Sequence, residues 1–222
     1  MKPRRSNQRN QALTLVEVAV IITIVVFLGA CYLSVLSAAH KGTKEINCLN
    51  NLHEIGVAHQ QWVNDNNPFP LLSSTDNRLG RSAHHDGAYV LWQAMSNQLN
   101  TPKILVCPAD RKRTVATNFT SGFGNANISY FLNAVAKNDL QTILDGDANL
   151  IVDGVPVQSG IFNVWTNNRV GWTKERNHGM GQAWGNCVGN IGMADGSLQE
   201  VTSNTLNSVF AASPATNRLV FP

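Results

Sequence analysis

Three residue types that together could form a thiol hydrolase site occur in the chain, as Cys107, His178 and Asp195. A cysteine attacks as its thiolate, and a histidine oriented by a carboxylate can supply that activation. No local signature accompanies these residues. Asp195 precedes Gly196, and this pair suits the positive φ angles of a tight turn. We therefore expect a protein that is not an enzyme.

Two clusters have the residue types of metal sites. His84-His85-Asp86 is compact, but neighbouring side chains point in different directions in most backbones. The run 145–149, Asp-Gly-Asp-Ala-Asn, begins like a calcium loop. Its sixth position is Leu150 where an EF-hand needs glycine, and its twelfth is Pro156 where glutamate is needed. The sequence thus predicts no EF-hand, and we assign no metal-binding residues and no cofactor.

One carboxylate lies inside an apolar segment. Residues 18–39 contain neither charge nor proline, and at about 1.5 Å per residue such a helix crosses the roughly 30 Å of a membrane interior. A removable signal has a shorter apolar core, of about 7–15 residues. Glu17 directly precedes this run and follows Leu13, Leu15 and Val16. A charge at such a depth costs on the order of 3 kcal/mol, so Glu17 is a functional candidate.

The net charge of +3 is concentrated at the N-terminus. Residues 1–12 contain four basic residues and no acid, which leaves 13 basic and 14 acidic residues in the rest of the chain. A basic segment before an apolar helix is expected to stay on the cytoplasmic side. The nearly neutral remainder offers no electrostatic basis for binding nucleic acid.

A cut between Ala12 and Leu13 would give Glu17 a partner. It would create an amine four residues before Glu17, and a carboxylate that meets such an amine, its own or a neighbour's, loses most of the insertion cost. In an uncut chain, solvation of Glu17 by lipid headgroups is the simpler explanation.

Residues 11–18, Gln-Ala-Leu-Thr-Leu-Val-Glu-Val, resemble the processing site of type IV prepilins and type II secretion pseudopilins. The resemblance implies that prepilin peptidase cuts after Ala12 and N-methylates Leu13. It also implies that Glu17 pairs with a neighbouring subunit's N-terminus during assembly. Most members have glycine before the cut and phenylalanine after it, so Ala12 and Leu13 are departures. Calcium in irregular loops occurs among pseudopilins, which leaves calcium binding open.

A rival interpretation uses the same helix. Leu28-Gly29-Ala30-Cys31 fits the lipobox of a bacterial lipoprotein, which is lipidated on Cys31 and cut before it. A lipoprotein usually continues with a polar linker, whereas residues 32–36 remain apolar.

The apolar helix is expected to continue as an amphipathic stem. Its apolar positions are spaced by four and three residues, which is one stripe of a helix. They are Cys48, Leu52, Ile55, His59 and Trp62. Asn64 to Pro68 should end the helix. A stem with one apolar face must be covered by a head domain.

Beyond the stem, shorter elements are expected. A short helix is predicted at 89–95, and β-strands at 104–106, 142–144, 150–152 and 161–164. The strongest hairpin signal spans 188–201 with its turn at Asp195-Gly196. A last helix over 206–211 would be capped by Ser203. The expected fold class is α+β, and the resemblance to prepilins implies a type IV pilin-like fold, with a long transmembrane helix packed on a small antiparallel sheet. Its segments are the leader 1–12, the transmembrane helix 13–39, the exported stem 40–67 and the head 68–222.

A narrower resemblance covers residues 48–56 and Val106-Cys107-Pro108, which are similar to a large bacterial prepilin-type family. Its members end in a His-x9-Asp-Gly motif, to which His178, Asp195 and Gly196 correspond. Sixteen residues separate His178 from Asp195 here, not nine.

Three cysteines, Cys48, Cys107 and Cys187, would lie on the exported side, where disulfides are allowed. They permit three single pairings. The resemblance implies a Cys48–Cys107 disulfide, which would close a loop of about 60 residues and contribute about 3–4 kcal/mol in the chain-entropy model. Two buried thiols are the alternative.

Together these features predict a structural subunit, a minor pilin or pseudopilin of a type IV pilus or type II secretion system. Its expected partners are prepilin peptidase, other pilin or pseudopilin subunits and the inner membrane assembly platform, with no nucleic acid. It would cross the inner membrane once, with a cytoplasmic N-terminus and a periplasmic head, or lie in a cell-surface filament. The alternative is a membrane-tethered binding module or lipoprotein that does not polymerise.

Overall fold

The computed structural model describes residues 14–66, 87–136, 141–174, 187–213 and 216–222, without the side chains of residues 34–42 and 63. The chain divides into two compact units, Met1–His40 and Lys41–Pro222. Each is described by itself.

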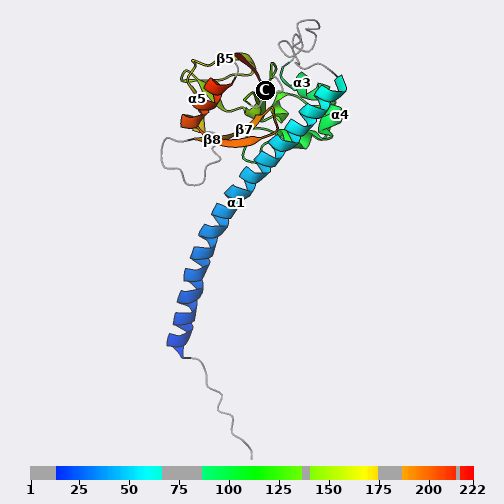
Figure 1. The fold of residues 1–222 in the computed structure, drawn as a ribbon. Coiled ribbons are helices and arrows are strands. Elements are labelled where there is room, and N and C mark those ends of the chain that lie inside the picture. Colours follow the sequence, from blue (N-terminus) through cyan, green and yellow to red (C-terminus); the bar gives the residue numbers. More distant parts are fainter. Residues whose placement is uncertain (1–13, 67–86, 137–140, 175–186, 214–215) are drawn as a thin grey trace, which may run out of the picture. The chain divides into compact units, whose positions relative to one another are not determined.

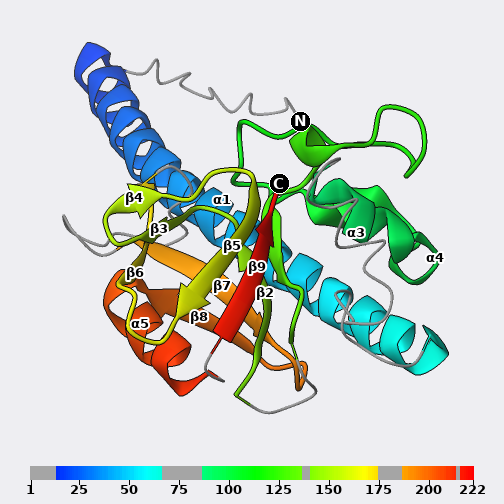
Figure 2. The same cartoon turned by 90° about the horizontal axis from the view of Figure 1, so that it is seen from above.

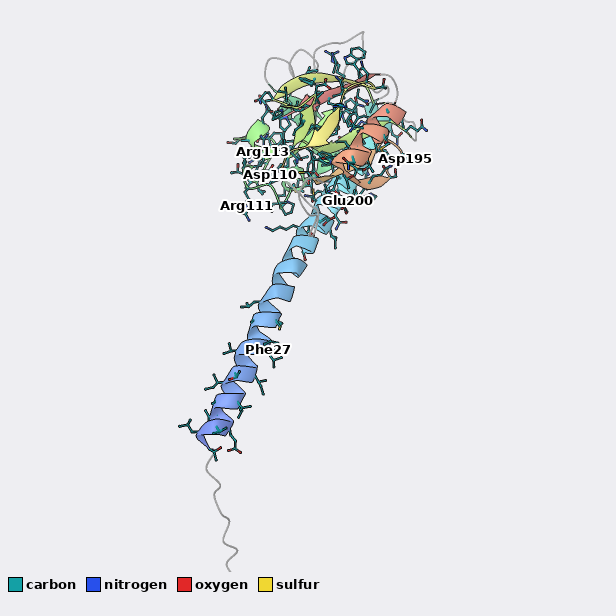
Figure 3. The ribbon with its side chains drawn as sticks, turned by 90° about the vertical axis from the view of Figure 1, so that its left-hand side faces the viewer. Phe27, Asp110, Arg111, Arg113, Asp195 and Glu200 are labelled. Atoms are coloured by element: carbon teal, nitrogen blue, oxygen red, sulfur yellow. The ribbon has the colours of Figure 1, made fainter. Side chains whose placement is uncertain are left out.

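The described residues of the first unit form the start of helix α1, Leu15–Asn66. Its stretch Leu15–Leu33 is 19 residues long and, by length and composition, apolar enough to cross a membrane. The side chains of this stretch are exposed, and Figure 3 shows Phe27 projecting from the helix. The unit therefore has one candidate membrane span among its described residues.

In the second unit, the last part of α1 buries the stripe that the sequence predicts. Cys48, Leu52 and Ile55 have no exposed surface, His59 is buried, and Trp62 packs against the same core. The helix ends at Asn66, within the predicted stop. Burial of these apolar side chains is the main force that holds the stem to the head.

A six-stranded antiparallel sheet forms the centre of this unit, in the order β5-β9-β1-β2-β7-β8 (Figure 2). Its strands are β5 Gly160–Trp165, β9 Thr216–Phe221, β1 Tyr130–Asn133, β2 Ile143–Asp147, β7 Val188–Met193 and β8 Leu198–Thr202. A second sheet has the order β4-β3-β6. Its strands are β3 Leu150–Val152, β4 Val155–Pro156 and β6 Val170–Trp172. Mixed helix and antiparallel sheet confirm the predicted α+β class.

Two apolar cores lie on opposite faces of the large sheet. One joins the stem to β1 and to the short helices α3 Tyr89–Ala94, α4 Ser96–Leu99 and η1 Pro102–Leu105. The 3₁₀ helix η2, Asn125–Asn127, directly precedes Ile128 of this core. The other joins the small sheet to helix α5, Ser203–Ala212. Figure 1 shows α5 beside β8. The six-stranded sheet is thus covered on both faces.

Several predicted elements are confirmed, and two need correction. The helix at 89–95, the strands at 150–152 and 161–164 and the hairpin within 188–201 are present. The strand predicted at 104–106 is wrong, because Thr101 caps and Pro102 opens the 3₁₀ helix η1. The predicted cap is displaced by one residue. Thr202 caps α5, whereas the Ser203 hydroxyl accepts from the Trp172 backbone amide at 3.0 Å.

Candidate functional site

The processing residues lie outside the described part of the chain. This holds for Ala12 and Leu13, for the family-motif residue His178 and for the His84–Asp86 cluster. Cleavage and methylation therefore stay predictions. Cys31 lies within α1 and is exposed.

Glu17 forms a capping box with Thr14 at the start of α1. The Glu17 carboxylate accepts hydrogen bonds from the Thr14 amide and the Thr14 hydroxyl, both at 2.8 Å. In return the Glu17 amide donates to the Thr14 hydroxyl at 3.3 Å. This arrangement satisfies amides that the first turn of a helix leaves without intrahelical partners. Glu17 thus has a local structural role that its apolar surroundings do not reveal.

Asp195 and Gly196 form the predicted turn between β7 and β8. The φ angle of Gly196 is +87°, which explains the need for glycine at this position. The exposed Asp195 carboxylate accepts from the Ser197 hydroxyl at 2.7 Å and from its amide at 2.8 Å. Bonds to the ionised form, the hydroxyl first, lower the pKa of Asp195. Asp195 is therefore accounted for as a turn residue, and Figure 3 labels it on the hairpin.

The most chemically distinctive site is buried beneath the stem. Ligand atoms of Cys48, Cys107 and Asp147 lie within 4.8 Å of one another, and all three residues are buried. The Cys48 Sγ atom is 3.6 Å from Asp147 Oδ1 and 3.2 Å from the Tyr130 hydroxyl. The predicted neighbours Cys48 and Cys107 are thus brought together. No disulfide joins these two sulfurs in this structure, and the disulfide that the resemblance implies stays a prediction.

Separate elements position these four side chains. Cys48 belongs to the buried stripe of α1, and Cys107 follows η1. Tyr130 and Asp147 are opposite one another in the β1–β2 ladder. The Asn190 amide of β7 donates to Asp147 Oδ2 at 2.8 Å. The site is therefore assembled only when stem, loop and sheet come together.

The loop that carries Cys107 is fixed by its own hydrogen bonds. The Ala109 amide donates to Cys107 Sγ at 3.4 Å, and the Asp110 amide donates to the Cys107 carbonyl at 2.9 Å. The Asp110 carboxylate accepts from the Ser129 hydroxyl at 2.9 Å and lies 4.0 Å from Arg113 Nε. Figure 3 labels Asp110 and Arg113 on this loop. Because Ser129 directly precedes Tyr130, these bonds tie the loop to the start of β1.

Burial and mutual contact keep the Cys48 thiol and the Tyr130 hydroxyl protonated. A hydrogen bond with Cys107 and then burial raise the pKa of the Cys48 thiol far above its usual range. Burial likewise raises the pKa of the Tyr130 hydroxyl. A buried group favours its neutral form, since water no longer solvates the charge. The Cys48 thiol is therefore a weak nucleophile as it stands.

A second acidic residue, Asp145, lies two residues before Asp147 and has no exposed surface. Burial raises the pKa of Asp145 well above its usual value, and the charge of Asp147 adds to the effect, although the Gly192 backbone opposes it. The run that resembles the start of a calcium loop is hence largely strand β2, with two carboxyl groups in the interior.

The sequence prediction missed Asp147 and Tyr130 as neighbours of the cysteines. One signal for Asp147 was present in the sequence. The apolar run Leu150 to Val152 directly follows Asp145 to Asn149, which suggests that these acids are buried. A buried carboxylate needs a hydrogen-bonding or charged partner. No family model, curated protein or solved structure matches the chain.

Proposed function

We propose that this protein is a prepilin-like structural subunit, a minor pilin or pseudopilin of a type IV pilus or type II secretion system. The observation that carries the proposal is a single helix, Leu15–Asn66, that is apolar and exposed up to Leu33 and has a buried apolar stripe from Cys48. A membrane can cover the first stretch, and neighbouring helices in a filament can replace it.

The N-terminal sequence supports the same function. The basic leader 1–12, the junction Ala12-Leu13 and the acid Glu17 occur in the order that prepilin peptidase substrates have. In this proposal the peptidase cuts after Ala12 and methylates Leu13. The inner membrane then stores the subunit until the assembly platform transfers it to a filament.

Assembly also explains why Glu17 stands next to a membrane helix. The new amine of one subunit is positive, and the Glu17 carboxylate of its neighbour is negative. The Coulomb attraction between two such charges 4 Å apart is about 4 kcal/mol for an effective dielectric constant of 20. This attraction sets the axial position of each helix against the next.

Shearing of cells that produce the chain tests this function. The chain should be enriched in the sheared filament fraction, together with the other pilin or pseudopilin subunits. A membrane-tethered binding module would stay entirely with the membranes, and that result would contradict the proposal. A major outer-membrane protein of the same cells provides the control for membrane fragments in the sheared fraction.

A further inference from the structure

We propose that Cys48, Cys107 and Asp147 form a site for a thiophilic divalent cation, for which Zn²⁺ is the best match. This inference is independent of filament assembly. It starts from the ligand atoms, two sulfurs and one carboxylate oxygen, which lie within 4.8 Å of one another in the buried interior. Zn²⁺ accepts sulfur and oxygen ligands together, usually in a tetrahedral arrangement.

The spacing of one ligand pair suits such an ion. Zinc bonds of about 2.3 Å to sulfur and 2.0 Å to oxygen place the two ligand atoms about 3.5 Å apart in a tetrahedron. Cys48 Sγ and Asp147 Oδ1 are 3.6 Å apart. The other ligand atoms lie within 4.8 Å of one another, so side-chain movements of about 1 Å would bring all three to bonding distance of one cation. The Tyr130 hydroxyl or a water molecule can complete the coordination.

The surrounding donors also suit two thiolates and a carboxylate. The Ala109 amide points to Cys107 Sγ, and the Asn190 amide holds the second Asp147 oxygen. The Tyr130 hydroxyl is 3.2 Å from Cys48 Sγ and becomes the donor once that sulfur is ionised. Asn51 Nδ2 in turn lies 3.4 Å from the Tyr130 hydroxyl. Such outer partners orient the ligands of metal sites.

A disulfide would engage only the two sulfurs. A cation engages the carboxylate as well, and its two positive charges offset most of the three negative charges in the interior.

Because both thiols must lose their protons, binding should tighten as pH rises. The site would join the stem helix, the loop after η1 and strand β2, so the cation should stabilise the folded head.

The test uses the full chain in detergent, reduced, desalted without oxygen and titrated with zinc chloride alone. A single zinc ion per chain is expected, with Cys48 and Cys107 protected from alkylation while Cys187 keeps its rate. The variants Cys48→Ser, Cys107→Ser and Asp147→Asn should each bind more than about tenfold more weakly. Cys187→Ser, which changes a buried cysteine of the other core, is the matched control and should bind as the parent does.

Alkylation of the unaltered chain gives a readout that does not depend on the folding of any variant. Equal protection of Cys187, or an unprotected Cys48–Cys107 pair, overturns the proposal. A Cys48–Cys107 disulfide in chain isolated without reductant also overturns it, because oxidised sulfurs cannot be the ligands.

Discussion

Glu17→Gln is expected to remove the chain from sheared filaments while leaving its cleavage after Ala12 intact. Glutamine keeps the size and the hydrogen-bonding capacity of glutamate but has no charge. Loss of one partner from an ion pair in an apolar environment costs about 3 kcal/mol. Recovery in the filament fraction, measured by immunoblot against total cleaved chain, should therefore fall by more than about tenfold.

The choice of glutamine separates the charge of Glu17 from its place in the capping box. Glutamine can replace glutamate at the third position of such a box, so Glu17→Gln leaves the contacts with Thr14 available. Glu17→Ala removes both functions. Thr14→Ala removes only the cap, at a cost of about 1 kcal/mol.

These three variants give opposite patterns for the two roles. If the charge guides assembly, Glu17→Gln and Glu17→Ala should be equally defective, and Thr14→Ala should assemble. If Glu17 serves only to cap the helix, Glu17→Gln should assemble normally and Thr14→Ala should be defective. The second pattern would contradict the proposed role of Glu17.

Asp145→Asn is expected to stabilise the head, and the gain should grow as pH rises above about 4. The carboxyl group of Asp145 titrates near 3.8 when unfolded and well above this when buried. Stability from Asp145 is thus fully present below pH 3.8 and is lost as pH rises, with a slope of up to about 1.4 kcal/mol per pH unit. Asparagine has the same shape and removes this loss, so the gain should exceed about 1 kcal/mol at pH 8.

His59 should make the stability of the head depend on pH in the opposite direction. Burial lowers its pKa from 6.5 to about 4, so the folded state keeps the ring neutral. The contribution of His59 to the free energy of unfolding is present above pH 6.5. It is lost as pH falls towards 4, by about 3 kcal/mol in total. In the parent chain the two slopes oppose each other over this range.

Urea unfolding of the full chain in detergent, followed by the fluorescence of the buried Trp92 and Trp172, measures both effects. The Asp145→Asn variant should become more stable as pH rises from 4 to 6.5, and the His59→Gln variant should become less stable over the same range. Identical pH profiles for the parent and both variants would contradict the buried, neutral state of these groups.

The stem and the hairpin could be predicted because local patterns determine them. Cys48, Leu52 and Ile55 recur at helical spacing, and Asp195-Gly196 suits only a tight turn. Such signals need no knowledge of the rest of the chain.

The sheet order and the buried cluster could not be predicted in this way. Strand β9 lies between β5 and β1 through pairings distant in sequence, which no local pattern encodes. Asp145, Gly146 and Asp147 are poor strand formers, yet burial in the sheet overrides their preference. Because the carboxylate of Asp147 meets Cys48 across 99 residues, only the folded structure reveals this contact.

Mass spectrometry of the mature N-terminus, on chain purified from membranes, can establish whether this protein is processed as a prepilin. We expect a chain that begins with N-methylated Leu13. An acylated Cys31 at the N-terminus, or a chain that still begins at Met1, would contradict it.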